Sequence, residues 1–179
     1  MTKEENSMWI FEDEAKQYRP SSWQVSAGPG GPQGMREAQG IANIAAGIAM
    51  AESKIKQMQN SGGQAIPVHT YQGSVEVTDG SVILNGADVK NNIPLNLEIT
   101  FANIKHMSIG YDRNYPQMMT NGIPERALAP LKLEFLDSGK KRAVYIFTNF
   151  SSATGAPTTD NQQIFAALKA KGIKTGFHL

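Results

Sequence analysis

The chain has 179 residues and carries 17 lysines and arginines against 16 aspartates and glutamates, so its formal net charge is +1. A charge this close to zero creates no long-range field toward nucleic acid or an anionic membrane, and we expect neither as a partner. The absence of cysteine excludes disulfides, thiolate metal sites and cysteine nucleophiles. No apolar run approaches the ~20 residues of a transmembrane segment, and the acidic N-terminus does not resemble a signal peptide, so we expect a cytoplasmic protein.

Residues 1–27 combine charge with four large aromatic side chains and show no sustained periodicity. Disordered segments are poor in aromatic residues, which leaves two alternatives for this arm. It packs back on the rest of the chain, or its anchors Trp9 and Trp23 fill a partner's pocket. The Gly/Pro-rich run after it lacks the Gly-Lys-Ser/Thr ending of a phosphate loop. We therefore expect residues 1–34 to form an aromatic arm and a linker.

From residue 35 to residue 60 the apolar positions are spaced by three and four, which predicts an amphipathic helix. The stripe fills the a and d positions of nearly three heptads, as in a coiled coil. Two alternatives stay open: the helix packs on its own chain, or it associates with another copy or a partner helix. The candidate contact residues of this stripe are Ile41, Ile44, Ile48 and Ile55.

Two hairpins are predicted in the rest of the chain, which we expect to form a module at residues 64–179. The first turns at Asp79-Gly80, where both residues tolerate the positive φ of a type I′ turn. The second turns within residues 137–140. The pairs expected from the apolar alternation are Val77 with Val82, Val75 with Leu84, Leu133 with Val144, and Leu131 with Ile146.

Between the hairpins, apolar and polar residues alternate from Leu95 to Phe101 and again from Ile104 to Tyr111, which predicts two strands with one buried face each. A weaker run at residues 66–71 adds a further strand. Six or seven short strands without helical periodicity between them favour a small antiparallel barrel or sandwich, in a mainly β member of the α+β class.

The last predicted element is a helix at residues 160–171, with Thr159 or Asp160 as the N-cap and Gly172 as the C′ residue. Ile164 and Leu168 lie one turn apart on its apolar face. We expect this helix to cap one open end of the barrel.

This order of elements, strands followed by a long mid-domain loop, a late hairpin and one C-terminal helix, resembles the pleckstrin-homology-like (PH-like) superfold, including bacterial PH-like and GRAM-type domains. The resemblance covers about residues 66–174 and rests on the strand, bend and strand at residues 97–109 and on the hairpin and helix that end the chain. In lipid-binding members of the superfold, basic residues cluster in the loop of the first hairpin. The loop at residues 78–81 is acidic here, which argues against phosphoinositide binding.

The segment at residues 112–126 is the expected contact surface, because loops of this length are usually functional or disordered. It carries the aromatic, methionine and arginine side chains that interface cores favour, namely Arg113, Tyr115, Met118, Met119 and Arg126. The alternative is that the two methionines only cover the core. An exposed strand edge and the basic hairpin tip at residues 140–142 are further candidate surfaces.

No catalytic, cofactor or metal site is predicted. The three histidines are scattered without ligand spacing, and the chain has no Gly-x-Ser-x-Gly elbow. The sequence therefore predicts a non-enzymatic, PH-like protein-interaction module that forms a homo-oligomer through its N-terminal arm and helix. A structural subunit of a larger assembly is the alternative, and a lipid-binding domain or an enzyme without a linear motif are weaker interpretations.

Overall fold

The computed structural model of the chain describes residues 2–18, 66–120, 129–151 and 157–177. The chain divides into two compact units, one formed by residues 1–16 with 67–179 and the other by residues 17–66. The larger unit contains all the strands of the described residues. The helix predicted at residues 35–60, with Ile41, Ile44, Ile48 and Ile55, lies outside the described residues, as do Trp23 and Arg126.

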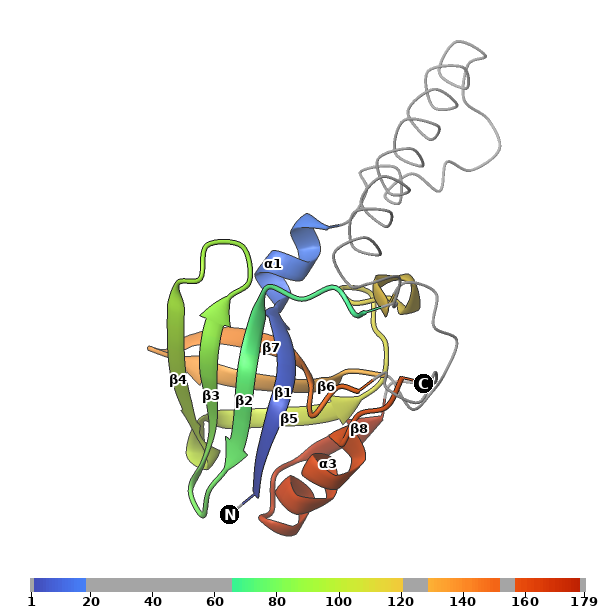
Figure 1. Cartoon of the computed structure of the whole chain (residues 1–179). Helices are drawn as coiled ribbons and strands as arrows, with labels where there is room; N and C mark the ends of the chain where they lie inside the picture. Colours follow the sequence, from blue (N-terminus) through green and yellow to red (C-terminus); the bar gives the residue numbers. More distant parts are fainter. Residues whose placement is uncertain (1, 19–65, 121–128, 152–156, 178–179) are drawn as a thin grey trace, which may run out of the picture. The chain divides into compact units, whose positions relative to one another are not determined.

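An eight-stranded sheet makes up most of the larger unit (Figure 1). Its strands are β1 (Thr2–Phe11), β2 (Tyr71–Val77), β3 (Ser81–Asp88), β4 (Pro94–Thr100), β5 (Ile104–Ile109), β6 (Leu131–Asp137), β7 (Lys140–Phe147) and β8 (Thr175–Phe177). They lie in the order β4-β3-β2-β1-β7-β6-β5-β8, and only the β5–β8 pair among these is parallel. The mainly β, α+β class is confirmed, whereas the expected six or seven antiparallel strands are corrected to eight strands in a mixed sheet.

The helical elements are short. They are α1 (Glu12–Gln17), α3 (Asn161–Ala170) and the 3-10 turns η2 (Phe101–Asn103) and η3 (Gln117–Thr120). α3 agrees with the predicted C-terminal helix to within a residue. Lys171 is its C-cap, and Gly172 follows with φ of 84°, where glycine avoids the steric cost of a positive φ. No helix in the described ranges has the length and apolar character needed to cross a membrane.

Strand β1 corrects the expectation that residues 1–34 form an arm and that the module starts at residue 64. β1 lies inside the sheet, paired with β2 on one side and with β7 on the other. Trp9 and Phe11 belong to the hydrophobic core, and Met8 and Ile10, on the opposite face, are buried as well. A strand buried on both faces shows no apolar alternation, and an irregularity between Glu4 and Ser7 also interrupts the period.

The sheet folds over on itself to enclose one core. In Figure 1, β1–β4 run across β5–β7, which pass behind them, and α3 lies beside β8 at the lower right. Side chains from both halves and from the helix form a single cluster that includes Trp9, Val75, Leu84, Ile99, Met107, Leu133, Val144, Ile146, Ile164 and Leu168. The apolar face predicted for α3 is therefore buried against the sheet, where each buried aliphatic side chain stabilises the fold by about 1.5–3 kcal/mol.

Both predicted hairpins are present in the predicted register. The observed pairs are Val77 with Val82, Val75 with Leu84, Leu133 with Val144, and Leu131 with Ile146. The β6–β7 connection is a two-residue turn in which Ser138 and Gly139 have φ of 50° and 79°. Positive φ at both positions is typical of a type I′ turn, which matches the twist of the strands.

The β2–β3 turn differs from the prediction. Neither Asp79 nor Gly80 has a positive φ, so the expected type I′ turn is wrong at this loop. The Thr78 hydroxyl closes the loop instead, because its Oγ1 accepts hydrogen bonds from the N–H of Gly80 at 3.2 Å and of Ser81 at 2.9 Å. Hydrogen bonds to the Thr78 side chain therefore stabilise this turn, where positive φ angles at Asp79 and Gly80 were expected.

This acidic loop does not lie in the first hairpin of the sheet. β1 precedes it, so residues 78–81 join the second and third strands rather than the first and second. Lys171 Nζ forms an ion pair with Asp79 at 3.0 Å, which places the loop beside the C-terminal end of α3. The acidic character of residues 78–81 is therefore no evidence about the first-hairpin loop, where basic residues cluster in lipid-binding domains. The expectation that the chain does not bind phosphoinositides stays a prediction.

Candidate functional site

The segment between β5 and β6, expected to be a contact surface, covers the outer face of β6 and β7. Tyr115 is fully buried, with its ring centroid 5.1 Å from that of Tyr145 and 5.6 Å from that of Phe147. Its hydroxyl donates a hydrogen bond to the Val68 carbonyl at 2.9 Å. Met119 is buried too.

Tyr115 and Met119 are therefore anchors of a second small core and not exposed contact residues. Of the predicted candidates in this segment, Arg113 is exposed, and the side chain of Met118 lies outside the described atoms. Trp9 is likewise 0% exposed, so its indole packs in its own sheet rather than in a partner. The burial of this outer face could have been predicted from the sequence, because residues 143–147 are continuously apolar, as in strands buried on both faces.

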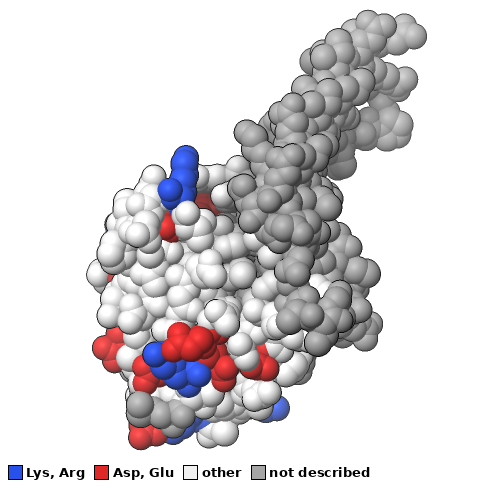
Figure 2. Space-filling model, in the orientation of Figure 1, with Lys and Arg blue, Asp and Glu red and all other residues white. Residues whose placement is uncertain are grey.

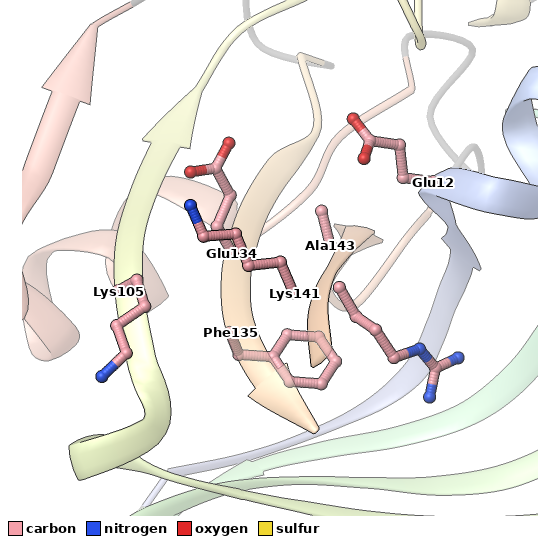
Figure 3. Close-up of a pocket in the computed structure, with 7 residues that line it drawn as sticks. Glu12, Lys105, Glu134, Phe135, Lys141 and Ala143 are labelled. Carbon is pink, nitrogen blue, oxygen red and sulfur yellow. The ribbon is translucent and has the colours of Figure 1, made fainter. Parts of the chain in front are cut away.

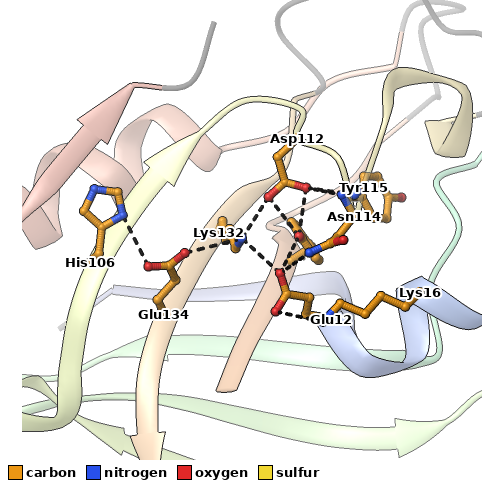
Figure 4. A network of polar contacts seen from close by, with 9 residues as sticks. Glu12, Lys16, His106, Asp112, Asn114, Tyr115, Lys132 and Glu134 are labelled. Carbon is orange, nitrogen blue, oxygen red and sulfur yellow. Dashed lines mark hydrogen bonds and ion pairs between the residues drawn. The ribbon is translucent and has the colours of Figure 1, made fainter. Parts of the chain in front are cut away.

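A charged network at Lys132 fixes this segment to the sheet (Figure 4). The Lys132 side chain, 11% exposed, donates hydrogen bonds to Asp112 at 2.8 Å and to Glu12 at 3.2 Å, and it lies 3.4 Å from Glu134. The Tyr145 hydroxyl donates to the Asp112 carboxylate at 2.9 Å. These residues come from the start of α1, the loop after β5, and the outer faces of β6 and β7.

The Asp112 carboxylate also organises its own loop. It accepts hydrogen bonds from the backbone N–H of Asn114 at 2.8 Å and of Tyr115 at 2.9 Å, which is the geometry of an Asx turn. The Asn114 amide in turn donates to the Glu12 carboxylate. The Asp112 carboxylate thus fixes the conformation of its own loop and also attaches that loop to Lys132 of the sheet.

The directions of the pKa shifts keep Glu12, Asp112, Lys132 and Tyr145 in their ordinary protonation states at neutral pH. Burial alone raises the pKa of Asp112 and of Glu12, but hydrogen bonds and charge from Lys132 and its neighbours outweigh burial, so both pKa values fall below their ordinary range. Burial lowers the pKa of Lys132, and the two carboxylates reverse that shift. Burial and the nearby carboxylates raise the pKa of Tyr145 far above its ordinary value.

Such a network stabilises structure and is poorly suited to proton transfer near pH 7, for which a group should titrate near neutrality. His106 extends it at the rim, with Nδ1 3.8 Å from Glu134. Across the described ranges, no group of three or more His, Asp or Glu side chains is arranged to hold a metal ion. The network's clearest role is to clamp α1 and the post-β5 loop on the sheet.

Beside the network, a hollow of about 300 Å³ opens on the outer face of β5–β7 (Figure 3). Its lining residues are Glu12, Lys105, Glu134, Phe135, Lys141, Arg142 and Ala143. The charges have both signs, and Arg142, part of the basic tip, is held by Asp137 at 2.7 Å and lies 4.3 Å above the Phe11 ring. The hollow is thus a mixed-charge surface without a set of converging cations.

The third candidate is the outer edge of β4. This strand ends the sheet, and along it the described residues contain no hydrogen-bonded neighbour other than β3. The loop before it carries the two most exposed large apolar side chains among the described residues, Val89 at 51% and Ile93 at 60%. Figure 2 shows a larger group of charged residues toward the lower end of the face formed by β1–β4, a smaller one at its upper end and mostly uncharged atoms between them.

Two hydrogen bonds show which backbone groups of β4 face β3 and which face the open edge. Phe101 N–H donates to the Gly80 carbonyl at 2.8 Å, and Asp88 N–H donates to the Ile93 carbonyl at 2.9 Å. Because successive residues of a strand point their backbone groups to opposite sides, the odd-numbered residues of β4 bond to β3. The N–H and C=O groups of Asn96, Glu98 and Thr100 therefore point to the open edge.

Comparison with known proteins gives little beyond this geometry. No protein-family model matches the chain, and no curated protein matches it. A solved structure similar to it is the hSac2 domain from the human phosphoinositide phosphatase Sac2, with a TM-score of 0.41 and 10% sequence identity over 63% of this chain and 70% of that one. A likeness of this size carries no argument about fold or function.

Proposed function

We propose that the chain is a non-enzymatic, PH-like protein-interaction module that self-associates. The PH-like part is supported by the order of elements: antiparallel strands, a long segment between β5 and β6, a late hairpin and one C-terminal helix. The interaction part is carried by one observation, the open edge of β4 next to two exposed apolar side chains.

An open strand edge binds another strand through main-chain hydrogen bonds, and neighbouring apolar residues add affinity. Natural proteins usually protect such edges because they pair with other chains. The Lys132 network is a weaker alternative, since its charges are already paired within the chain. The hollow is weaker too, because charges of both signs line it and its Arg142 is already paired with Asp137. Two described strands end the sheet, β4 and the three-residue β8, and β4 is the longer of the two edges.

A structural subunit of a larger assembly is the second candidate. The observation that favours it is the division of the chain into two compact units. If the helix that the sequence predicts at residues 35–60 and the β4 edge each bind another copy, every chain has two interfaces. Two different self-associating interfaces allow growth beyond a dimer.

Sedimentation velocity of the full chain, from low micromolar to several hundred micromolar, tests self-association. We expect a mass above that of the 19.4 kDa monomer that rises with concentration. A second sample with Ile44→Glu and Ile48→Glu tests the helical stripe, and Lys54→Glu, a charged position of the same segment, is its control. A wild-type chain that stays monomeric at every concentration would refute the proposal.

A further inference from the structure

The β4 edge raises the question of which strand it binds, and its own sequence suggests an answer. Residues 93–101 read Ile-Pro-Leu-Asn-Leu-Glu-Ile-Thr-Phe, so apolar residues occupy the odd positions and all others the even positions. Leu95 and Leu97 are half-buried toward the core, while Asn96, Glu98 and Thr100 are exposed. We infer that the edge binds a second copy of itself, β4 against β4 in antiparallel orientation, about a two-fold axis at Leu97. This inference rests on the proposed function and specifies its interface.

Hydrogen bonding favours this register. With the axis at Leu97, Asn96 faces Glu98 of the second copy, and Thr100 faces Pro94. The N–H groups of Asn96, Glu98 and Thr100 then meet the carbonyls of residues 98, 96 and 94, so the three open donors of each copy are satisfied. Pro94, which has no N–H to donate, lies where only its carbonyl is needed.

Two other registers, with the axis shifted by one residue to Glu98 or to Asn96, are less favourable. With the axis at Glu98, the same number of donors is satisfied, but the two carboxylates face each other, and like charges directly opposite destabilise a strand pair. With the axis at Asn96, Thr100 faces Asn92, which has φ of 55° in the β3–β4 loop, so its donor is lost. The axis at Leu97 instead places each Glu98 carboxylate against the side-chain amide of Asn96.

Side-chain packing supports the same register. Leu97 faces Leu97 of the second copy, Leu95 faces Ile99, and the exposed Ile93 faces Phe101, itself only partly buried. The interface is isologous, as two-fold contacts are. Pro94 and Glu98 are residues that commonly protect an edge from pairing, yet in this register neither obstructs it.

Single cysteines test the register directly, because the natural chain has none. Directly opposed, non-hydrogen-bonded residues of an antiparallel pair have Cα atoms about 4.5 Å apart, within the range of a disulfide. Leu97→Cys should therefore form a disulfide-linked dimer rapidly under mild oxidation. Leu95→Cys is the matched control on the same face, since its two copies would lie four residues apart along the strands, about 13 Å. Equal and slow crosslinking of the two variants would overturn the inference.

A second measurement does not depend on a thiol. Glu98→Pro removes an N–H that points to the open edge without removing a bond to β3, and proline is tolerated on edge strands. We expect the dissociation constant of the dimer to rise by about tenfold or more, because each copy loses a donor, while Glu98→Ala, which keeps the N–H, retains the dimer. The thermal midpoint, extrapolated to low concentration where only monomer is present, should stay near the wild-type value.

These outcomes separate the inference from the proposed function. If Glu98→Pro associates as strongly as the wild type while the Ile44→Glu, Ile48→Glu variant is monomeric, self-association stands and the β4 interface is refuted. If the wild type itself is monomeric, both are refuted.

Discussion

Strands β1 and β4 belong to one sheet but have opposite surroundings. β1 has a hydrogen-bonded strand on each side, and residues 7–11 are buried on both faces. β4 has one bonded neighbour and keeps an alternation of exposed and more buried residues. Periodicity is therefore a good signal at the edge of this sheet and a poor one at its centre, where the stability is concentrated.

The largest loss of stability should come from a substitution in β1, at the centre of the sheet. Trp9→Ala removes a fully buried indole from the core, and we expect a loss of about 3–5 kcal/mol in the free energy of unfolding. Leu97→Ala on β4 is the edge counterpart and should cost clearly less, because its side chain is only partly buried. Chemical denaturation of both variants measures the difference. Equal losses would break the comparison between centre and edge.

The next effect concerns the junction of the sheet with α3. The Asn161 side chain, 1% exposed, accepts hydrogen bonds from the Thr148 N–H and hydroxyl and donates to the Ala129 and Ile146 carbonyls. Asn161→Leu keeps the volume but leaves these buried groups unpaired, at a cost of about 2–4 kcal/mol. Gln163→Leu is the control on the same helix, because the Gln163 side chain is exposed and, among the described residues, its amide donates only to the Asp160 carboxylate. Thermal unfolding that ranks the two variants equally would contradict this role.

Lys132→Met tests the clamp on the outer face. It removes the cation that Glu12 and Asp112 share, although Glu12 keeps Lys16 at 3.7 Å. We expect a loss of about 2–3 kcal/mol at pH 7, below the value for a fully buried pair because both carboxylates keep some solvent contact. Lys141→Met is the control, since Lys141 is exposed and forms no ion pair within the described part of the chain. Urea denaturation of both variants gives the two free energies of unfolding.

The pH dependence has a definite sign. The folded-state pKa values of Glu12 and Asp112 lie below their ordinary values of 4.5 and 3.8. Their contribution is therefore complete above about pH 5 and is lost as the pH falls through 4.5 and 3.8 to the lower folded values. The gap in thermal midpoint between wild type and Lys132→Met should narrow from pH 6 to pH 3. A constant gap would show that the lost stability comes from packing rather than from charge.

The smallest effect sharpens the comparison of the two turns. Gly139 has φ of 79°, so Gly139→Ala should cost about 1 kcal/mol. Gly80 has no positive φ, and a Cβ there would meet nothing within 4 Å, so Gly80→Ala should change stability by less than about 0.5 kcal/mol. Differential scanning calorimetry resolves such a difference. Equal shifts would mean that the β2–β3 turn needs its glycine as the β6–β7 turn does.

Local features of the fold could be predicted from the sequence. The registers of the β2–β3 and β6–β7 hairpins follow from short connections and period-2 patterns, and α3 follows from its boundary residues and apolar spacing. The type of the β2–β3 turn could not be predicted from Asp79-Gly80, because the Thr78 hydroxyl competes with the backbone for the same N–H groups.

The candidate surfaces were predicted less well. Composition suggested Tyr115 and Met119 as contact residues, yet residues rich in apolar area are favoured equally by interfaces and by cores. Only the neighbours decide, and here they are Val68, Tyr145 and Phe147. The sequence also did not predict that β4 is an edge strand, because the sequence of one strand does not specify the order of the strands across the sheet.

Residues close together in the chain, or composition alone, specify the two hairpins, the C-terminal helix, the mainly β class and the absence of thiol chemistry. Long-range contacts specify the place of β1, which pairs with strands more than 60 and 130 residues away, and the network at Lys132, whose members lie 20 and 120 residues apart in the chain. They also specify which strands, β4 and β8, lie at the edges of the described sheet. Contacts between distant residues form only when the whole core closes, so no local pattern encodes them.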